Sequence, residues 1–102
     1  MKTSGFGNSV IIAYEQSLDD DTKLLSITTK SDYRHRDLEW RTTNAYSEAW
    51  NYIADTLEKL GIKVHCDIDD NYLRIFYKTE AELTAVYTAI DLMTTKIDDI
   101  FI

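Results

Sequence analysis

The apolar side chains of this chain recur with two different periods, and this change of period restricts the fold more than any other feature. Over residues 44–60 they recur every three or four positions, as on one face of a helix. The same spacing returns over residues 79–97. The two apolar stripes consist of Tyr46, Trp50, Ile53, Ala54, Leu57 and Leu60, and of Leu83, Val86, Tyr87, Ile90, Met93 and Ile97. We therefore predict two amphipathic helices.

Capping signals stand at the ends of both stripes. Thr43 or Asn44 supplies a side-chain oxygen for the start of the first helix, and Gly61 follows its last apolar residue. Residues 79–82 read Thr-Glu-Ala-Glu, a capping-box sequence that predicts the start of the second helix.

Short β-branched or alternating runs precede each helix, and both patterns are typical of strands. The predicted strands cover residues 9–15, 23–30, 37–43, 62–69 and 72–78. The third of them rests on the alternation of Leu38 and Trp40 with charged neighbours. Polar turn sequences over residues 17–22 and 69–71 predict two hairpins.

These elements follow the order βββαββα, in which each helix has one apolar stripe and each strand one apolar face. One antiparallel sheet of four to five strands with two helices packed on one face buries all of these surfaces. We therefore predict an α+β fold, a two-layer sandwich, in a single domain over residues 9–102. Residues 1–8 contain Gly and Ser without a hydrophobic pattern, and we interpret them as a flexible N-terminal tail.

The composition excludes several classes of function. The formal net charge is −7 at pH 7, which opposes non-specific binding to nucleic acid or to anionic lipid. The one cysteine forms neither an intramolecular disulfide nor an all-cysteine metal site. The chain has no apolar run that could span a membrane and no basic-then-apolar signal segment. We therefore expect a cytoplasmic protein without a membrane partner.

Residues that could carry chemistry have simpler structural explanations. Cys66 lies on the predicted inner face of its strand, and His65 points to the other face, out of hydrogen-bond reach. His65, Asp67 and Asp69 share a face, but Asp residues beside a turn are favoured for their bonds to the backbone. No phosphate loop, nucleophile elbow or zinc motif occurs in the sequence. We therefore predict no catalytic residue, no metal, no cofactor and no enzymatic activity.

The outward face of the last predicted hairpin is the strongest candidate for a binding surface. Tyr72, Arg74 and Phe76 alternate there, and aromatic residues and arginine dominate the centres of protein interfaces. Six acidic side chains would face basic residues of the partner. These acidic residues are Asp19, Asp20, Asp21, Asp67, Asp69 and Asp70. We therefore expect protein–protein contact that covers a basic, nucleic-acid-handling surface of a partner.

The second predicted helix offers a surface for self-association. We interpret Ala85, Ala89 and Leu92 as lying together, away from the core stripe of this helix. Small residues allow a second helix to approach closely, and a homodimer is the commonest form of self-association.

Two alternatives remain open. A single-stranded nucleic-acid-binding domain is one, because basic and aromatic residues gather in one segment and could stack on bases. The residues concerned are Tyr33, Arg34, Arg36, Trp40 and Arg41. Acidic residues within the same segment nearly cancel its charge, so nucleic acid is the less favoured partner. A small-ligand-binding domain around His65 and its acidic neighbours is the other.

The sequence matches no family motif, so any likeness to known proteins rests on amino-acid composition alone. The chain is short, acidic, rich in tyrosine and free of proline. Phage-encoded inhibitors of nucleic-acid machinery often have this composition, as do many unrelated adaptors. We therefore expect a phage-type inhibitor or modulator that acts by binding.

Overall fold

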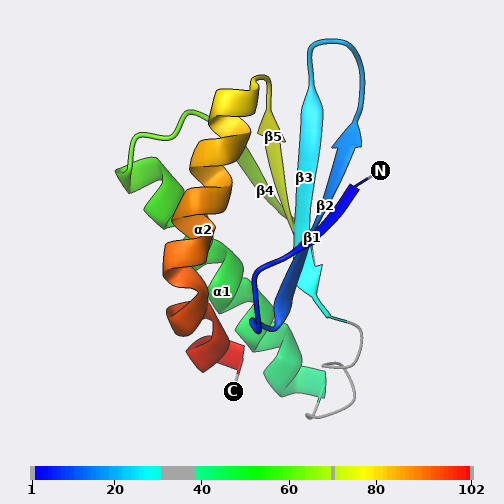
Figure 1. The fold of residues 1–102 in the computed structure, drawn as a ribbon. Coiled ribbons are helices and arrows are strands. Elements are labelled where there is room, and N and C mark those ends of the chain that lie inside the picture. The colour runs from blue at the N-terminus through cyan, green and yellow to red at the C-terminus, as the bar shows by residue number, and fades with distance from the viewer. Residues whose placement is uncertain (1, 31–38, 70, 102) are drawn as a thin grey trace.

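The computed structural model describes residues 2–30, 39–69 and 71–101, with the backbone alone for residues 39–44 (Figure 1). The described residues form five strands and two helices in the predicted order βββαββα. The strands are β1 (Lys2–Gly5), β2 (Ile11–Ser17), β3 (Lys23–Thr29), β4 (His65–Asp69) and β5 (Tyr72–Tyr77), and the helices are α1 (Glu39–Lys59) and α2 (Glu80–Phe101). The predicted α+β class is confirmed.

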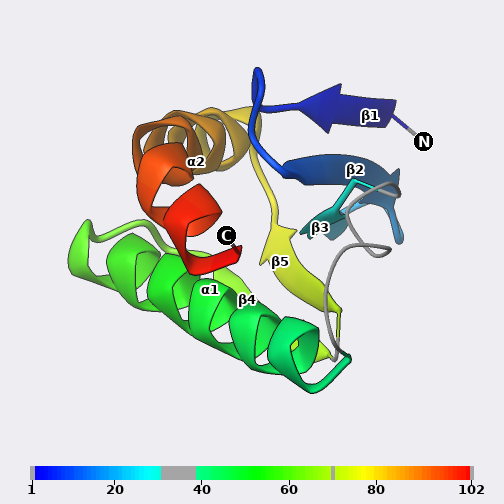
Figure 2. The same ribbon diagram turned by 90° about the horizontal axis from the view of Figure 1, so that it is seen from below.

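The five strands form one antiparallel sheet with the order β1-β2-β3-β5-β4. β2 and β3 form one hairpin, β4 and β5 form the other, and pairing of β3 with β5 joins them. Figure 2 shows the sheet curving around the helices, with α1 beside β4 and α2 on the side of β1. Both helices therefore pack on one face, the inner face, as predicted. No described helix covers the opposite, outer face.

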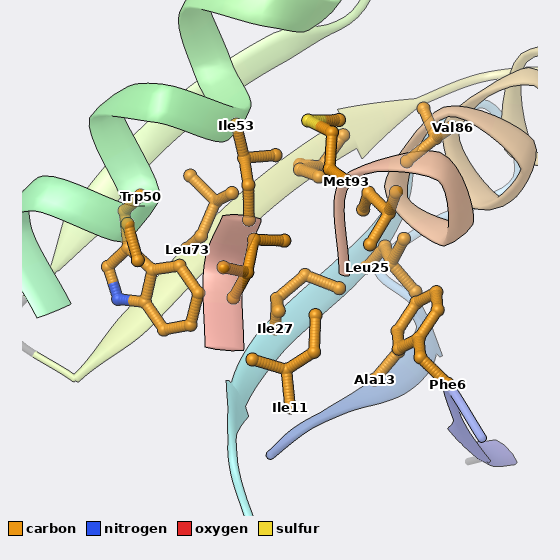
Figure 3. Close-up of a cluster of buried hydrophobic side chains, with 14 of the residues drawn as sticks. Phe6, Ile11, Ala13, Leu25, Ile27, Trp50, Ile53, Leu73, Val86 and Met93 are labelled. Carbon is orange, nitrogen blue, oxygen red and sulfur yellow. The ribbon is translucent and has the colours of Figure 1, made fainter. Parts of the chain in front are cut away.

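The core lies between the inner face of the sheet and the two helices (Figure 3). The central strands supply its floor, because the inward residues Leu25, Ile27, Leu73 and Ile75 all have 0% exposure. Both helices turn their predicted stripes towards this floor, except for Leu60, which follows the last residue of α1 and is 60% exposed. Burial of this apolar area is the main source of the stability of the fold.

Aromatic rings close the core where α1 and α2 meet. Phe101, in the last turn of α2, makes edge-on contacts with Tyr46 and Trp50 of α1, with ring centroids 5.3 and 5.8 Å apart. Three residues earlier, the Asp98 carboxylate accepts a hydrogen bond of 2.7 Å from the Ser9 hydroxyl. The end of α2 is thereby tied both to α1 and to the segment that precedes β2.

The sequence prediction of a strand over residues 37–43 is wrong. The structure places α1 there from Glu39 onwards, so the predicted N-cap at Thr43 or Asn44 is wrong as well. Alternation over so few residues is weak evidence for a strand. Extending a helix that has already formed gains one hydrogen bond per residue, and the cost of helix nucleation is not incurred again. The third strand of the order βββαββα is therefore not at residues 37–43.

The missing strand lies in the segment that was interpreted as a tail. Residues Lys2–Gly5 form β1, which pairs with β2, and Phe6 beyond it is 5% exposed. Lys2 also lies 3.9 Å from the Glu15 carboxylate of β2. Backbone hydrogen bonds can hold an edge strand whose side chains do not alternate between apolar and polar. The sequence of β1 therefore has no hydrophobic periodicity from which the strand could be predicted.

The predicted helix caps at residues 61 and 79–82 are confirmed. Gly61 has a φ of 75°, and its N–H donates to the Glu58 carbonyl at 3.0 Å, as in a Schellman motif. At the start of α2 the Thr79 hydroxyl accepts from the N–H of Glu82 at 3.2 Å. The Glu82 carboxylate accepts in return from the N–H groups of Lys78 and Thr79, which lowers the pKa of Glu82.

The two leucines at positions 73 and 92 test this description of the core. We expect Leu73→Ala to lower the free energy of unfolding by about 2–5 kcal/mol, because it opens a cavity at a fully buried position. Leu92 is 83% exposed, so Leu92→Ala changes the same quantity by less than about 0.5 kcal/mol. Urea denaturation of both variants measures the difference, and equal effects would contradict the assignment of Leu73 to the core.

Candidate protein-binding surface

The alternation of side chains along the strands builds the outer face of the sheet. Residues directly opposite one another in antiparallel strands share a face. One row across the outer face runs from Leu24 to Phe76 and on to His65. A second row runs from Tyr14 through Arg74 to Asp67.

Tyr72, Arg74 and Phe76, the three predicted anchors, all lie on this outer face. They alternate with the buried inward residues of β5, so the sequence prediction of their direction agrees with the structure. Phe76 is half-buried and its ring centroid lies 5.8 Å from that of His65. Tyr72 is 39% exposed.

The outer face is more apolar than a surface that meets only water requires. Leu24 is 9% exposed although it lies on the face that no described helix covers, opposite Phe76. Ile12 and Tyr14 of β2 are half-buried on the same face, and the exposed Gln16 is the β2 residue directly opposite Leu24. We refer to Ile12, Tyr14, Leu24 and Phe76 together as the apolar strip of β2, β3 and β5; Ser26 and Thr28 interrupt it on β3. Such strips on one side of a monomer mark contact surfaces.

Charged side chains border the strip along β4. The Arg74 guanidinium contacts the Asp69 carboxylate at 2.9 Å, and both side chains are about half exposed, at 42% and 48%. Asp67 lies opposite Arg74 in the register of β4 and β5, but the described residues include no ion pair of Asp67. This end of the outer face therefore has an excess of negative charge.

The predicted acidic residues do not form one cluster. Asp19 belongs to the turn between β2 and β3, where its carboxylate accepts from the N–H groups of Asp21 and Thr22 at 2.8 and 2.7 Å. That turn lies at the end of the sheet marked by the Lys23–Tyr77 pair, whereas Asp69 lies opposite Tyr72 at the other end. Asp20 is exposed in the same turn, and Asp70 lies outside the described residues.

The interpretation of Ala85, Ala89 and Leu92 as one exposed surface is wrong. Ala89 is 5% exposed and belongs to the core, because it lies one helical turn from Val86 and Met93. Ala85 is half-buried, and Leu92 alone of the three is highly exposed. The three residues therefore give no support to self-association through α2.

The segment proposed for nucleic-acid binding falls mostly outside the described residues. Tyr33, Arg34 and Arg36 lie there, and Trp40 and Arg41 belong to the first turns of α1, where the backbone alone is described. The continuous strand that would have displayed Trp40 and Arg41 on a sheet is absent, since α1 has already begun.

Cys66 and His65 point to opposite faces of β4, as predicted. Burial raises the pKa of the Cys66 thiol, which favours its protonated, unreactive form. Across the described ranges, no three residues of the His, Cys, Asp and Glu types are placed to hold a metal ion. The described part of the chain also lacks a helix long and apolar enough to cross a membrane.

A polar cleft that was not predicted from the sequence lies on the inner side of the sheet. The cleft has a volume of about 750 Å³ and is lined by Lys2, Glu15, Gln16, Ser17, Lys23, Tyr77 and Glu80. Lys2 and Lys23 pair loosely with Glu15 and Glu80 across it, at 3.9 and 3.8 Å. No local pattern reveals this cleft, because it depends on the pairing of β1 with β2.

One hydrogen bond anchors α2 beside this cleft. The Tyr87 hydroxyl donates to the Glu15 carboxylate at 2.7 Å. Burial, together with the negative charge of Glu15, raises the pKa of Tyr87 to about 12.

The comparisons with known proteins give no relative. No protein-family model matches this chain, and neither a curated protein nor a solved structure matches it.

The tyrosine at position 87 makes stability depend on pH. Its pKa is about 12 in the folded state against an ordinary 10.0, so folding favours the neutral phenol. The stabilisation from this shift is complete below about pH 10 and is lost as the pH rises towards about 12. We expect the difference in free energy of unfolding between the wild type and Tyr87→Phe to shrink from about pH 9 to about pH 11. Urea denaturation at both pH values measures it, and a constant difference contradicts the expectation.

Proposed function

We propose that this protein binds another protein through the outer face of its sheet and covers a basic surface of that partner. The observation that carries the proposal is the apolar strip over β2, β3 and β5 that no described helix covers. Binding is the whole activity in this proposal, and no chemical step is involved.

Phe76 and Tyr72 are the anchors of the contact. Both side chains combine large apolar area with partial exposure, so a partner can remove further apolar surface from water. Each square ångström of that surface contributes roughly 25 cal/mol to association before the entropic costs are subtracted. Arg74 lies between the two anchors along β5 and offers hydrogen bonds at the centre of the contact.

The charge of the protein restricts the partner to one with a basic surface. The net charge of −7 attracts basic proteins at a distance and accelerates their association. Asp67 and Asp69 supply negative charge beside the anchors, and Asp19–Asp21 supply it at the other end of the sheet. A surface that handles nucleic acid has the matching charge. A partner of this kind would be blocked from its nucleic acid, which is how phage-type inhibitors could act.

Substitution of the anchors tests the proposal. We expect Phe76→Ala and Tyr72→Ala each to weaken partner binding by about tenfold or more, because truncating an interface anchor removes its buried contact. Leu60→Ala is the matched control, since Leu60 is 60% exposed at the end of α1, away from the outer face. The measurement is capture from cell lysate with and without nuclease, followed by calorimetric titration of the identified partner.

Two results contradict the proposal. Partners that nuclease releases would indicate a nucleic-acid-binding protein and return attention to residues 33–41. Equal capture by the Phe76→Ala, Tyr72→Ala and Leu60→Ala variants would remove the outer face from the contact. Circular dichroism of each variant establishes that the domain is folded, which separates loss of binding from loss of structure.

A further inference from the structure

β4 is an edge strand whose free side is unpaired in the described structure. It pairs with β5 on one side, and β5 separates it from β3. No backbone hydrogen bond from elsewhere in the described ranges reaches the other side of residues His65–Asp69. Edge strands of this kind present a row of N–H and C=O groups to which another strand can bind.

The core is incomplete along this edge. Cys66 and Ile68 lie opposite Ile75 and Leu73, so all four side chains point to the inner face. Ile75 and Leu73 have 0% exposure, whereas Ile68 is 38% exposed and Cys66 is half-buried. The apolar layer between sheet and helices therefore extends to β4 without being covered there.

A groove between β4 and α1 continues this uncovered layer. It has a volume of about 500 Å³ and is lined by Ala54, Asp55, Leu57, Glu58, Gly61, Ile62, Lys63, Val64 and Cys66. The C-terminal part of α1 forms one wall, and residues 61–64 with Cys66 of β4 form the other. Its lining combines apolar side chains with two carboxylates of α1, those of Asp55 and Glu58, and with one basic side chain, that of Lys63, so that negative charge is in excess.

Negative charge lies on both sides of the edge and selects what can bind there. Asp67 and Asp69 point to the outer face of β4, and Asp55 and Glu58 stand on the helix side. A second copy of this chain would bring its own acidic β4 against this one, and like charges on neighbouring strands repel. A strand with basic side chains gains from the same charges.

We propose that an extended segment of the partner protein adds to β4 as a sixth strand. Its backbone pairs with the free edge, and its apolar side chains alternate inwards beside Ile68 and beside Cys66, which borders the groove. Its basic side chains face Asp67 and also Asp69, which is already paired with Arg74. This inference rests on the proposed function, because it names the part of a basic partner that is held. It adds a contact on a different surface, so strand addition can fail while the proposed function stands.

The other edge of the sheet does not offer the same site. The inward residues of β1 are Lys2 and Ser4, which are polar, and Lys2 is paired with Glu15. The cleft beside β1 is lined mainly by charged and polar side chains. An apolar side chain placed there would gain little, so β4 is the edge that fits an amphipathic strand.

A synthetic peptide tests strand addition directly. The probe is a capped peptide of about seven residues in which lysine and valine alternate, labelled for fluorescence anisotropy. The control has the same composition with the lysines grouped at one end. Two further peptides carry N-methyl groups on alternate amides, one on the odd-numbered and the other on the even-numbered residues. Each therefore lacks the N–H donors along one edge of the strand, while its charge and side chains are unchanged.

We expect the alternating peptide to bind about tenfold more tightly than the grouped control, and methylation in one frame to abolish the gain. Asp67→Lys weakens binding about tenfold, whereas Asp91→Lys, at an exposed position on α2, changes it less than about twofold. Hydrogen exchange of the wild type with bound peptide shows new protection within residues 65–69. This last measurement needs no variant and therefore does not depend on the folding of Asp67→Lys.

Several results would overturn the inference. If the alternating and grouped peptides bind equally, or if neither methylated peptide binds more weakly, then the binding is due to electrostatic attraction alone. Protection at β1 or on α2 instead of β4 places the contact elsewhere, and no binding at low salt removes the site. If the peptide fails while Phe76→Ala still weakens the captured partner, the proposed function stands and strand addition alone is wrong.

Discussion

Burial of two helix stripes on the same face of one sheet is the constraint on which the other features depend. Both helices pack against the inner residues of β3 and β5, so the fold is limited to two layers. One face of the sheet is left without a helix, and its apolar residues must be shielded by one another or by a partner. The same arrangement leaves β4 at the edge, where α1 covers the inner layer incompletely.

The sequence predicted the elements whose signals are local. The helix stripes, Gly61 and the capping box at residues 79–82 depend on neighbours along the chain, and they agree with the structure. β1 could not be predicted, because an edge strand held by backbone bonds needs no apolar alternation. The start of α1 was misplaced because a few alternating residues fit both a strand and one face of a helix. Side-chain spacing over so short a segment does not distinguish a strand from a helix.

The candidate site was predictable to the extent that it depends on strand direction. Alternation along β5 was enough to place Tyr72, Arg74 and Phe76 away from the core. The groove beside β4 was not predictable, because it requires knowing that β3 pairs with β5, two strands with all of α1 between them in sequence. The two acidic turns read alike in the sequence, and the register of the strands places them at opposite ends of the sheet.

The packing of Phe101 against Tyr46 and Trp50 affects the order of events during synthesis. A chain still growing on the ribosome has made α1 and all five strands long before the last turn of α2 emerges, and until then this aromatic cluster lacks one ring. Domains generally fold as units during synthesis. Stable closure of this core therefore waits until the last turn of α2 has left the exit tunnel, because only then can Phe101 complete the aromatic cluster.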